Sequence, residues 1–164
     1  MIIVLYGVSG SGKSHVGNLL ARQLGWTFLD ADDYHPPENI HKMKRGEPLS
    51  DVDRLPWLRT LADKISNLQD NHVHAVLACS ALKQAYRDVL GVDNDTVVAV
   101  LLSGDPRLIE RRLQQRQHAF MPVQLLRSQL AALEPPATGL VFDIADTPEK
   151  ICSSISRALN LVSQ

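Results

Sequence analysis

One stretch near the N-terminus has the residue types and the spacing that phosphate binding requires. Gly7, Gly12, Lys13 and Ser14 occupy the fixed positions of the pattern G-x-x-x-x-G-K-[ST]. Glycines let backbone N–H groups turn toward a phosphate, because no Cβ blocks positive φ or close approach. The lysine supplies a mobile charge for the β- and γ-phosphates, and the serine hydroxyl suits Mg²⁺, which keeps most of its waters. The predicted nucleotide contacts are Gly7, Val8, Ser9, Gly10, Ser11, Gly12, Lys13 and Ser14.

The residues on either side of this motif predict a strand before it and a helix after it. Ile2–Tyr6 is an unbroken apolar run, typical of a strand buried on both faces of a parallel sheet. The following apolar residues recur at helical spacing, and Gly25 is suited to end that helix. A helix that begins at the motif also points its positive end at the phosphate. The apolar helix positions are Val16, Leu19, Leu20 and Leu24.

A pair of carboxylates narrows the phosphate chemistry. The predicted strand 26–30 delivers Asp30 and Asp32 to the edge of the sheet where ligands bind in open α/β proteins. On extended backbone two residues apart, both side chains point the same way. Asp30 then suits Mg²⁺ through water, and Asp32 suits a substrate hydroxyl. The alternative is a solvated acidic loop.

Two other kinds of nucleotide-binding protein fit the sequence poorly. A motor-type ATPase carries an Asp after a central strand, whereas the predicted strand 75–79 ends in Cys79 and Ser80. A GTPase switch needs a guanine-reading Asn/Thr-Lys-x-Asp pattern, and no lysine lies in that context. A kinase therefore remains as the favoured class.

Composition limits the class of protein further. The chain has 164 residues, which suits a single domain over 1–164. Lys plus Arg is 17 and Asp plus Glu is 18, so the net charge of −1 does not support nucleic acid or an anionic membrane as the main partner. The two cysteines are too few for a disulfide framework or a four-cysteine zinc site. With no membrane-length apolar run and no secretion signal, we expect a soluble cytoplasmic protein.

Strand and helix patterns alternate along the chain, which predicts a three-layer α/β domain with a parallel sheet. The segment 114–134 adds a helix between two units where a plain connection needs few residues. We expect this insertion to be a mobile lid, the alternative being a fixed helix packed on the body. Further strands are predicted at 26–30, 75–79, 96–102 and 140–144, and helices at about 36–46, 50–68, 80–90, 105–113, 122–134 and 148–161.

The residues that follow the glycine-rich motif resemble a known family along nearly the whole chain. They are Asp30–Pro36, Asn39, Lys42, Met43, Gly46–Leu49, Asp51–Arg54, Pro56–Leu58, Cys79–Lys83, Tyr86, Arg87, Phe120–Pro122, Leu125, Leu126, Ser128, Gln129 and Leu133–Pro135. This set resembles the gluconate kinases, small relatives of shikimate kinase. The stretch 35–58 is the most specific part. In one departure, Ala119 stands where the family usually has a His before the Phe of its lid, with His118 one residue earlier.

The resemblance implies an activity and an architecture. The activity is ATP-dependent phosphorylation of D-gluconate at its 6-hydroxyl, giving 6-phosphogluconate and ADP. The architecture is a P-loop kinase fold with five parallel strands in the order 2-3-1-4-5, Mg²⁺ dependence and a homodimer. The alternatives are a kinase of another small hydroxy acid, such as shikimate, and a nucleotide-binding regulator.

The residues for substrate and phosphate follow from this interpretation. Asp32 is predicted to orient the attacking hydroxyl or accept its proton, beside Lys13. Arg54 suits the gluconate carboxylate as a bidentate donor, the alternative being a salt bridge to Asp51 or Asp53. The remaining predicted polyol contacts are His35, Lys83 and Arg87, the alternatives being a turn residue for His35 and a solvated helix face for Lys83 and Arg87.

Two arginines at the start of the insertion are assigned to the nucleotide. Arg112 and Arg116 lie four residues apart, which puts them on one face if the helix continues. By resemblance to such kinases, Arg112 stacks on adenine and Arg116 meets the phosphates and acts in catalysis. The alternative is a solvated basic face. The turn at Asp146 is predicted to border adenine through backbone groups, and Cys79 to be a buried strand residue rather than a nucleophile.

Overall fold

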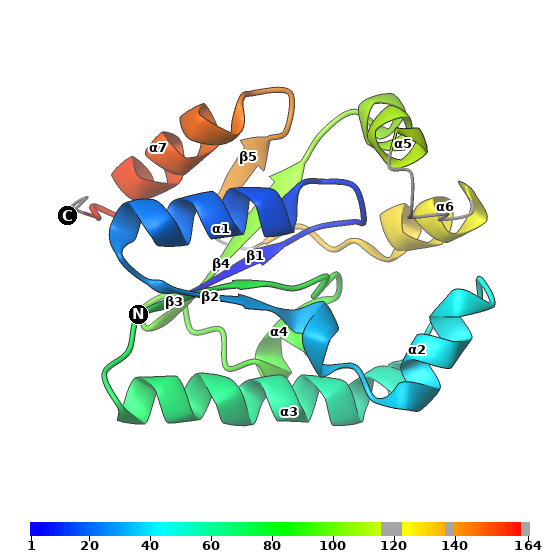
Figure 1. Cartoon of the computed structure of the whole chain (residues 1–164), viewed down its shortest axis with the longest axis horizontal. Coiled ribbons are helices and arrows are strands. Elements are labelled where there is room, and N and C mark those ends of the chain that lie inside the picture. The colour runs from blue at the N-terminus through cyan, green and yellow to red at the C-terminus, as the bar shows by residue number, and fades with distance from the viewer. Residues whose placement is uncertain (116–122, 137–139, 162–164) are drawn as a thin grey trace.

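The computed structural model describes residues 1–115, 123–136 and 140–161. Within these ranges, five parallel strands form one sheet in the order β2-β3-β1-β4-β5 (Figure 1). This is the predicted order. The central strand β1 pairs with β3 on one side and β4 on the other, so the chain crosses over on both sides of it. The strands are β1 Ile2–Tyr6, β2 Thr27–Asp30, β3 Ala75–Ala78, β4 Val97–Ser103 and β5 Val141–Asp143.

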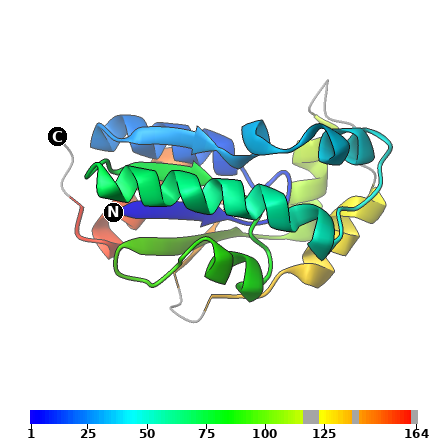
Figure 2. The same ribbon diagram turned by 90° about the horizontal axis from the view of Figure 1, so that it is seen from below.

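Helices cover both faces of the sheet, as Figures 1 and 2 show. On one face lie α1, which spans Lys13–Leu24, and α7, which spans Pro148–Ala158. On the other lie the long helix α3, Asp51–Asp70, and the short α4, Gln84–Val89. The predicted three-layer α/β architecture is therefore confirmed.

The apolar run of β1 explains why both faces of the sheet must be covered by helices. Successive side chains of a strand point to opposite faces. Ile3 and Leu5 pack into the cluster of buried side chains beneath α1 and α7, whereas Ile2, Val4 and Tyr6 pack into the cluster beneath α3 and α4. All five are fully buried, so β1 lies in the middle of the domain and holds the residues that follow it firmly in place.

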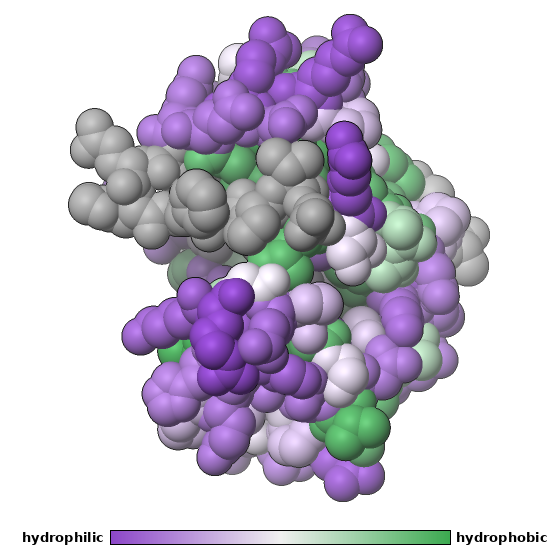
Figure 3. Space-filling view, turned by 90° about the vertical axis from the view of Figure 1, so that its right-hand side faces the viewer, coloured by the Kyte–Doolittle hydropathy of each residue, from purple (hydrophilic) through white to green (hydrophobic). Residues whose placement is uncertain are grey.

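Three further helices lie at the end of the molecule where the strands end. They are α2, Pro37–Lys44; α5, Pro106–Gln114; and α6, Val123–Ala132. In Figure 1 they stand to the right of the sheet, beyond the carboxyl ends of the strands. Figure 3 looks onto this end, where hydrophilic side chains predominate among the coloured residues. Polar groups therefore gather at the edge where ligands bind in α/β folds.

The conformation between β2 and α2 differs from the predicted one. We expected Asp30 and Asp32 on one extended segment, but Ala31–Tyr34 forms a 3-10 helix with Asp30 as its N-cap. The Asp30 carboxylate accepts a hydrogen bond from the Asp32 N–H, which favours this turn over an extended strand. The two acids still lie at the same edge, but because of capping and not because of the strand's alternation.

Candidate active site

The glycine-rich motif forms a loop between β1 and α1 at the centre of the strand edge. Its last glycine, Gly12, is the N-cap of α1 with φ of 91°, a left-handed conformation that glycine adopts without strain. Gly10 has φ of 82°, and a Cβ there would lie 2.8 Å from Cγ of Leu113. The loop is therefore shaped by backbone conformations and close packing that a side chain would disturb, which fits a cradle of N–H groups for phosphate.

The side chains beside this loop form a connected polar network. The Ser14 hydroxyl donates to Oδ2 of Asp30 at 2.6 Å, and the N–H of Asp32 donates to Oδ1 of Asp30 at 3.1 Å. The Lys13 ammonium donates to the Val8 carbonyl at 3.0 Å. Lys13, Ser14, Asp30 and Asp32 all line a cavity of about 90 Å³ against the loop. The structure thus brings together the predicted phosphate, magnesium and proton-accepting residues.

The oxygen atoms of Ser14 and Asp30 fit a magnesium ion of the kind that phosphate-transfer enzymes use. Mg²⁺ prefers hard oxygen ligands and is usually held by one or two protein groups together with phosphates and waters. Among the described residues, no group of three or more His, Cys, Asp and Glu side chains could form a dedicated metal cage. The hydroxyl and the carboxylate at the loop suit the open arrangement.

Asp32 faces the open cavity and has a perturbed acidity. Its side chain is 84% exposed to water, but it lies in a concave site among many protein atoms. This partial loss of solvation raises the pKa of Asp32, and the negative charges of Asp30 and Asp33 raise it further, while Lys13 and Arg54 act in the opposite direction. A carboxylate with a raised pKa is a better proton acceptor than an ordinary one.

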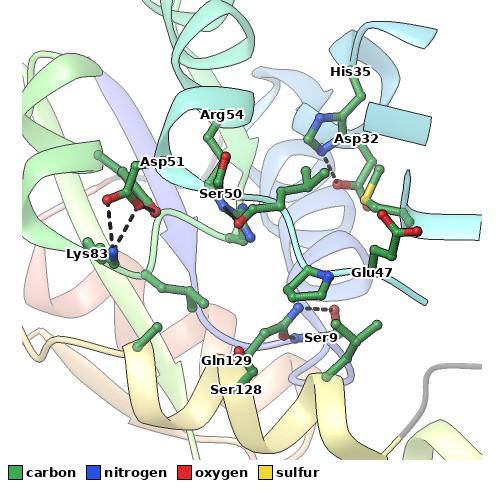
Figure 4. Close-up of a pocket in the computed structure, with 18 residues that line it drawn as sticks. Ser9, Asp32, His35, Glu47, Ser50, Asp51, Arg54, Lys83, Ser128 and Gln129 are labelled. Carbon is green, nitrogen blue, oxygen red and sulfur yellow. Dashed lines mark hydrogen bonds and ion pairs between the residues drawn. The ribbon is translucent and has the colours of Figure 1, made fainter. Parts of the chain in front are cut away.

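A larger cavity of about 580 Å³ opens beside the phosphate loop (Figure 4). Polar side chains from several segments point into it, as the close-up shows. Residues far apart in the sequence meet here: the turn after β2, the N-terminal turns of α3, the segment before α4, and α6. Its polar lining is Ser9, Asp32, His35, Glu47, Ser50, Asp51, Arg54, Ser80, Lys83, Tyr86, Ser128 and Gln129.

Arg54 lies in this cavity without the predicted competing salt bridge. Its Nε donates to the Leu49 carbonyl at 3.4 Å, and its guanidinium lies 5.6 Å from the ring centre of Tyr86. Among the described residues, no carboxylate forms an ion pair with it. Asp51 and Asp53 are each engaged elsewhere. Arg54 therefore lines a cavity of about 580 Å³, a size that suits a small acid.

Lys83 and Tyr86 reach the same cavity as partners of Asp51. The Lys83 ammonium donates to both carboxylate oxygens of Asp51, at 2.9 and 3.2 Å, and the Tyr86 hydroxyl donates to one of them. These contacts lower the pKa of Asp51 and join α3 to the segment before α4. Lys83 thus stands at the cavity wall, as expected, but with its charge already paired.

Arg87 does not fit the predicted substrate role. It is 1% exposed and does not line the cavity. Its guanidinium donates to the carbonyls of Ala81 and Leu82, at 2.9 and 3.1 Å, and lies 4.4 Å from the ring centre of Tyr6. Because its N–H groups bind carbonyl groups of the chain itself, Arg87 holds the turn after β3 in shape.

Gln129 is a site residue to which the sequence assigned no role. From α6 its Oε1 accepts a hydrogen bond from the Ser9 N–H at 2.7 Å, and its Nε2 donates to the Ser9 hydroxyl at 3.3 Å. These bonds, drawn in Figure 4, join the inserted helix directly to the phosphate loop. In the sequence, Gln129 was noted only as part of the family resemblance. The type and position of a polar residue on a helix do not predict a hydrogen-bond partner 120 residues away.

A third cavity, of about 300 Å³, lies against the loop at Gly10, Ser11 and Gly12. Arg112 and Asp146 both line it, together with His15. The Arg112 guanidinium donates to the Ile144 carbonyl at 2.7 Å, and the Asp146 carboxylate binds Lys150. Arg116 lies outside the described residues, as does Ala119. Cys79 is buried, and burial raises the pKa of its thiol to about 12, as expected for a structural residue.

The fold and the site together define a class: an α/β nucleotide-binding domain with a P-loop beside a polar acceptor cavity. Residues 2–136 match the family model of the AAA domain. The chain is 45% identical to a probable gluconokinase of Xenopus tropicalis over 95% of its own length and 90% of the relative's. Among solved structures, it is similar to a sugar kinase from Janibacter sp., with a TM-score of 0.91 and 40% identity over 98% and 95% of the two chains.

A further solved structure makes the assignment more specific. A gluconokinase from Sinorhizobium meliloti matches with a TM-score of 0.80 and 36% identity, over 96% of this chain and 94% of the other. The chain therefore belongs to the gluconokinase family.

Proposed function

We propose that this protein transfers the γ-phosphoryl group of ATP to the 6-hydroxyl of D-gluconate, giving 6-phosphogluconate and ADP. One observation carries the proposal most directly. The P-loop and an acceptor cavity of about 580 Å³ share a wall at Ser9 and Asp32, with Arg54 in the same cavity. Such a cavity offers hydrogen-bonding groups for a polyol and a planar cation for its carboxylate.

The residues supply positioning and charge rather than covalent chemistry. In the proposed reaction a new bond forms between the 6-oxygen and the γ-phosphorus, and the bond from that phosphorus to the β,γ-bridging oxygen breaks. Asp32 orients the 6-hydroxyl and takes its proton, for which its raised pKa is suited. Lys13 and the N-terminus of α1 stabilise the negative charge on the phosphates. Arg54 binds the carboxylate at the far end of the substrate.

The proposal includes Mg²⁺, held at Ser14 and by Asp30 through water. When bound, the ion would supply positive charge that neutralises the phosphates. Arg112 is proposed to contact the base and Arg116 the phosphates, with Asp146 at the border of the base site. Lys83 and His35 complete the acceptor cavity.

The inserted segment 114–134 is proposed to close over the reacting groups and exclude water. Support comes from α6, whose residues Leu125, Ser128 and Gln129 already form part of the acceptor wall. Protease cleavage in this segment should slow when an ATP analogue and gluconate are added together, because closure hides the backbone. Unchanged cleavage with both ligands would favour a fixed helix.

A homodimer and a cytoplasmic location complete the proposal. The homodimer rests on the family resemblance, and sedimentation at several protein concentrations tests it. The location is supported by two unpaired buried cysteines, which suit a reducing compartment. In the described ranges, none of the helices combines the length and the hydropathy that a membrane span needs.

The decisive experiment measures ADP release across a panel of acceptors. ADP release should rise strongly with D-gluconate and little with glucose, which lacks the carboxylate. Shikimate in the same panel tests the alternative kinase, and ATP turnover that is indifferent to every acceptor would favour a regulator. Equal activity on gluconate and glucose would contradict the role of the carboxylate.

A further inference from the structure

Asn39 is a buried polar residue without a part in the proposed chemistry. It lies in the first turn of α2 and is 3% exposed. Its Nδ2 lies 3.0 Å from the Asp53 carbonyl oxygen and 3.3 Å from Nδ1 of His35. A buried amide normally has all its hydrogen bonds satisfied, so these two contacts define its orientation.

The contact with Asp53 decides which atom of the amide faces His35. A backbone carbonyl only accepts hydrogen bonds, so the atom of Asn39 beside it must be the NH₂ group. That nitrogen has two hydrogens and no lone pair to offer. One hydrogen goes to the Asp53 carbonyl, and the other goes to Nδ1 of His35. Nδ1 must then be an acceptor without a proton.

His35 is held so that its other nitrogen faces Asp32. Its ring stacks on Trp57 with 4.2 Å between ring centres and 14° between planes, and the Trp57 indole N–H is itself fixed by the Ala31 carbonyl at 2.7 Å. Nε2 of His35 lies 3.8 Å from Oδ1 of Asp32, a direction that Figure 4 shows. Burial and the charge of Arg54 lower the pKa of His35 to about 4, so the ring is neutral at neutral pH.

A neutral imidazole without a proton on Nδ1 carries it on Nε2. We propose that Asn39 is a positioning residue that holds His35 as the Nε2–H tautomer, so that His35 presents a donor to the Asp32 carboxylate. At 3.8 Å, Nε2 of His35 and Oδ1 of Asp32 lie beyond hydrogen-bond distance, so the proposal requires the Asp32 side chain to move toward Nε2 of His35 when the acceptor binds. The opposite tautomer presents a lone pair to the carboxylate and repels it. The catalytic part of this inference rests on the proposed function; the tautomer does not.

The tautomer is measured directly on the whole protein labelled with ¹⁵N at histidine. In long-range ¹H–¹⁵N spectra the protonated and unprotonated ring nitrogens of a neutral histidine resonate far apart. The signals of His35 are assigned as those missing from His35→Gln. We expect an unprotonated Nδ1 and a protonated Nε2. The reverse pattern, or a doubly protonated ring at neutral pH, would overturn the proposal. This readout needs no turnover, so it stands even if gluconate is not the acceptor.

The consequence for Asp32 is measured by kcat in a double-mutant cycle. Asn39→Ala should lower kcat roughly 10-fold or more, with little change in the KM for ATP. In His35→Gln, the side-chain amide of the glutamine can also donate an N–H to Asp32. An amide has no tautomer for Asn39 to select, so this donor does not depend on Asn39. Adding Asn39→Ala to His35→Gln should therefore cost almost nothing further. An equal loss in both backgrounds, or no loss in either, would mean that Asn39 only supports the fold.

Two further variants separate positioning from folding. Lys42 also joins α2 to Asp53, with its ammonium 2.6 Å from the Asp53 carboxylate, but it does not touch His35. Lys42→Met should leave kcat and the His35 spectrum unchanged, and a loss equal to that of Asn39→Ala would contradict the proposal. If Asn39→Ala does not fold, Asn39→Asp replaces it. A carboxylate only accepts hydrogen bonds, so the spectrum should then show a proton on Nδ1 of His35, and an unchanged spectrum would contradict the proposal.

Discussion

The two halves of the candidate site are built from different parts of the chain. In the phosphate half, one uninterrupted run of residues after β1 forms the loop, and its shape depends on glycine conformations and on the start of α1. In the acceptor half, Asp32, Arg54, Lys83 and Gln129 come from separate segments and line the cavity. Apart from Lys13 and Ser14, the non-glycine side chains of a loop that binds through backbone N–H groups should tolerate substitution, whereas the side chains that line the acceptor cavity should not. The following predictions test that difference.

The largest effect is expected at Asp32. Asp32→Asn keeps the size of the side chain but removes its charge and basicity, so kcat should fall roughly 10²-fold or more while the KM for ATP changes little. Steady-state kinetics with gluconate and ATP varied separately measure both. Asp33→Asn, on the exposed neighbour, is the matched control and should stay near wild type. A kcat for Asp32→Asn within a few-fold of wild type would move the role to Asp30.

A pH-dependent loss of stability is expected from His35. Folding lowers its pKa from 6.5 to about 4, so between these values the unfolded chain binds a proton that the folded chain does not. The free energy of unfolding should therefore fall as the pH drops from 6.5 to 4, by up to about 3 kcal/mol. Urea unfolding across this range measures the slope. His35→Gln should remove the contribution of His35 to the pH dependence of the free energy of unfolding. An identical slope in both proteins would mean that burial does not lower the pKa of His35.

A smaller effect, confined to one substrate, is expected at Arg54. Arg54→Lys keeps the charge but loses the planar fork, so the KM for gluconate should rise about 10-fold with the KM for ATP nearly unchanged. Arg59→Lys, on an exposed turn of the same helix, controls for helix effects. A loss of thermal stability with a normal KM for gluconate would mean that Arg54 is a structural residue.

Gln129 joins the two halves of the site, so its loss should change the KM values of both substrates by a small factor. Gln129→Leu removes two neutral hydrogen bonds to Ser9, each worth about 1 kcal/mol. The KM values for ATP and gluconate should each change a few-fold, and amide hydrogen exchange in α6 should become faster. The exposed Arg127→Ala on the same helix is the control. Normal exchange and normal KM values would show that the contact does not hold α6 to the loop.

The smallest effect is expected at Ser11 in the phosphate half. Its hydroxyl is buried and has no hydrogen-bond partner among the described residues. Ser11→Ala removes an unsatisfied group, so the free energy of unfolding should stay the same or rise by up to about 1 kcal/mol. The KM for ATP should remain within about two-fold, since the loop binds through its backbone. A strongly raised KM would show that this hydroxyl contacts phosphate and would weaken the contrast between the halves.

Most of the fold followed from local patterns. The apolar run of β1 and Gly25 at the end of α1 stand where the sequence predicted them, and the helices capped by Ser50 and Asp105 begin where helices were predicted. These signals are short-range, because a cap or an alternation acts within a few residues. The 3-10 turn after β2 was missed, since the bond between Asp30 and the Asp32 N–H competes locally with the extended conformation.

The difference between local and long-range contacts also explains which site residues could be predicted from the sequence. The phosphate loop is contiguous, so residue types and spacing were enough to identify it. The pair of acids after the second strand pointed to Asp32, and the resemblance added Arg54. For Arg87 the sequence offered a polyol contact or a solvated helix face, and neither anticipated its burial against the carbonyls of Ala81 and Leu82. Gln129 acquires a role only when Ser9 is brought beside it, and the orientation of the Asn39 amide is decided only when the Asp53 carbonyl is brought beside it. Side-chain partnerships of this kind depend on how helices pack on the sheet, and no local spacing encodes them.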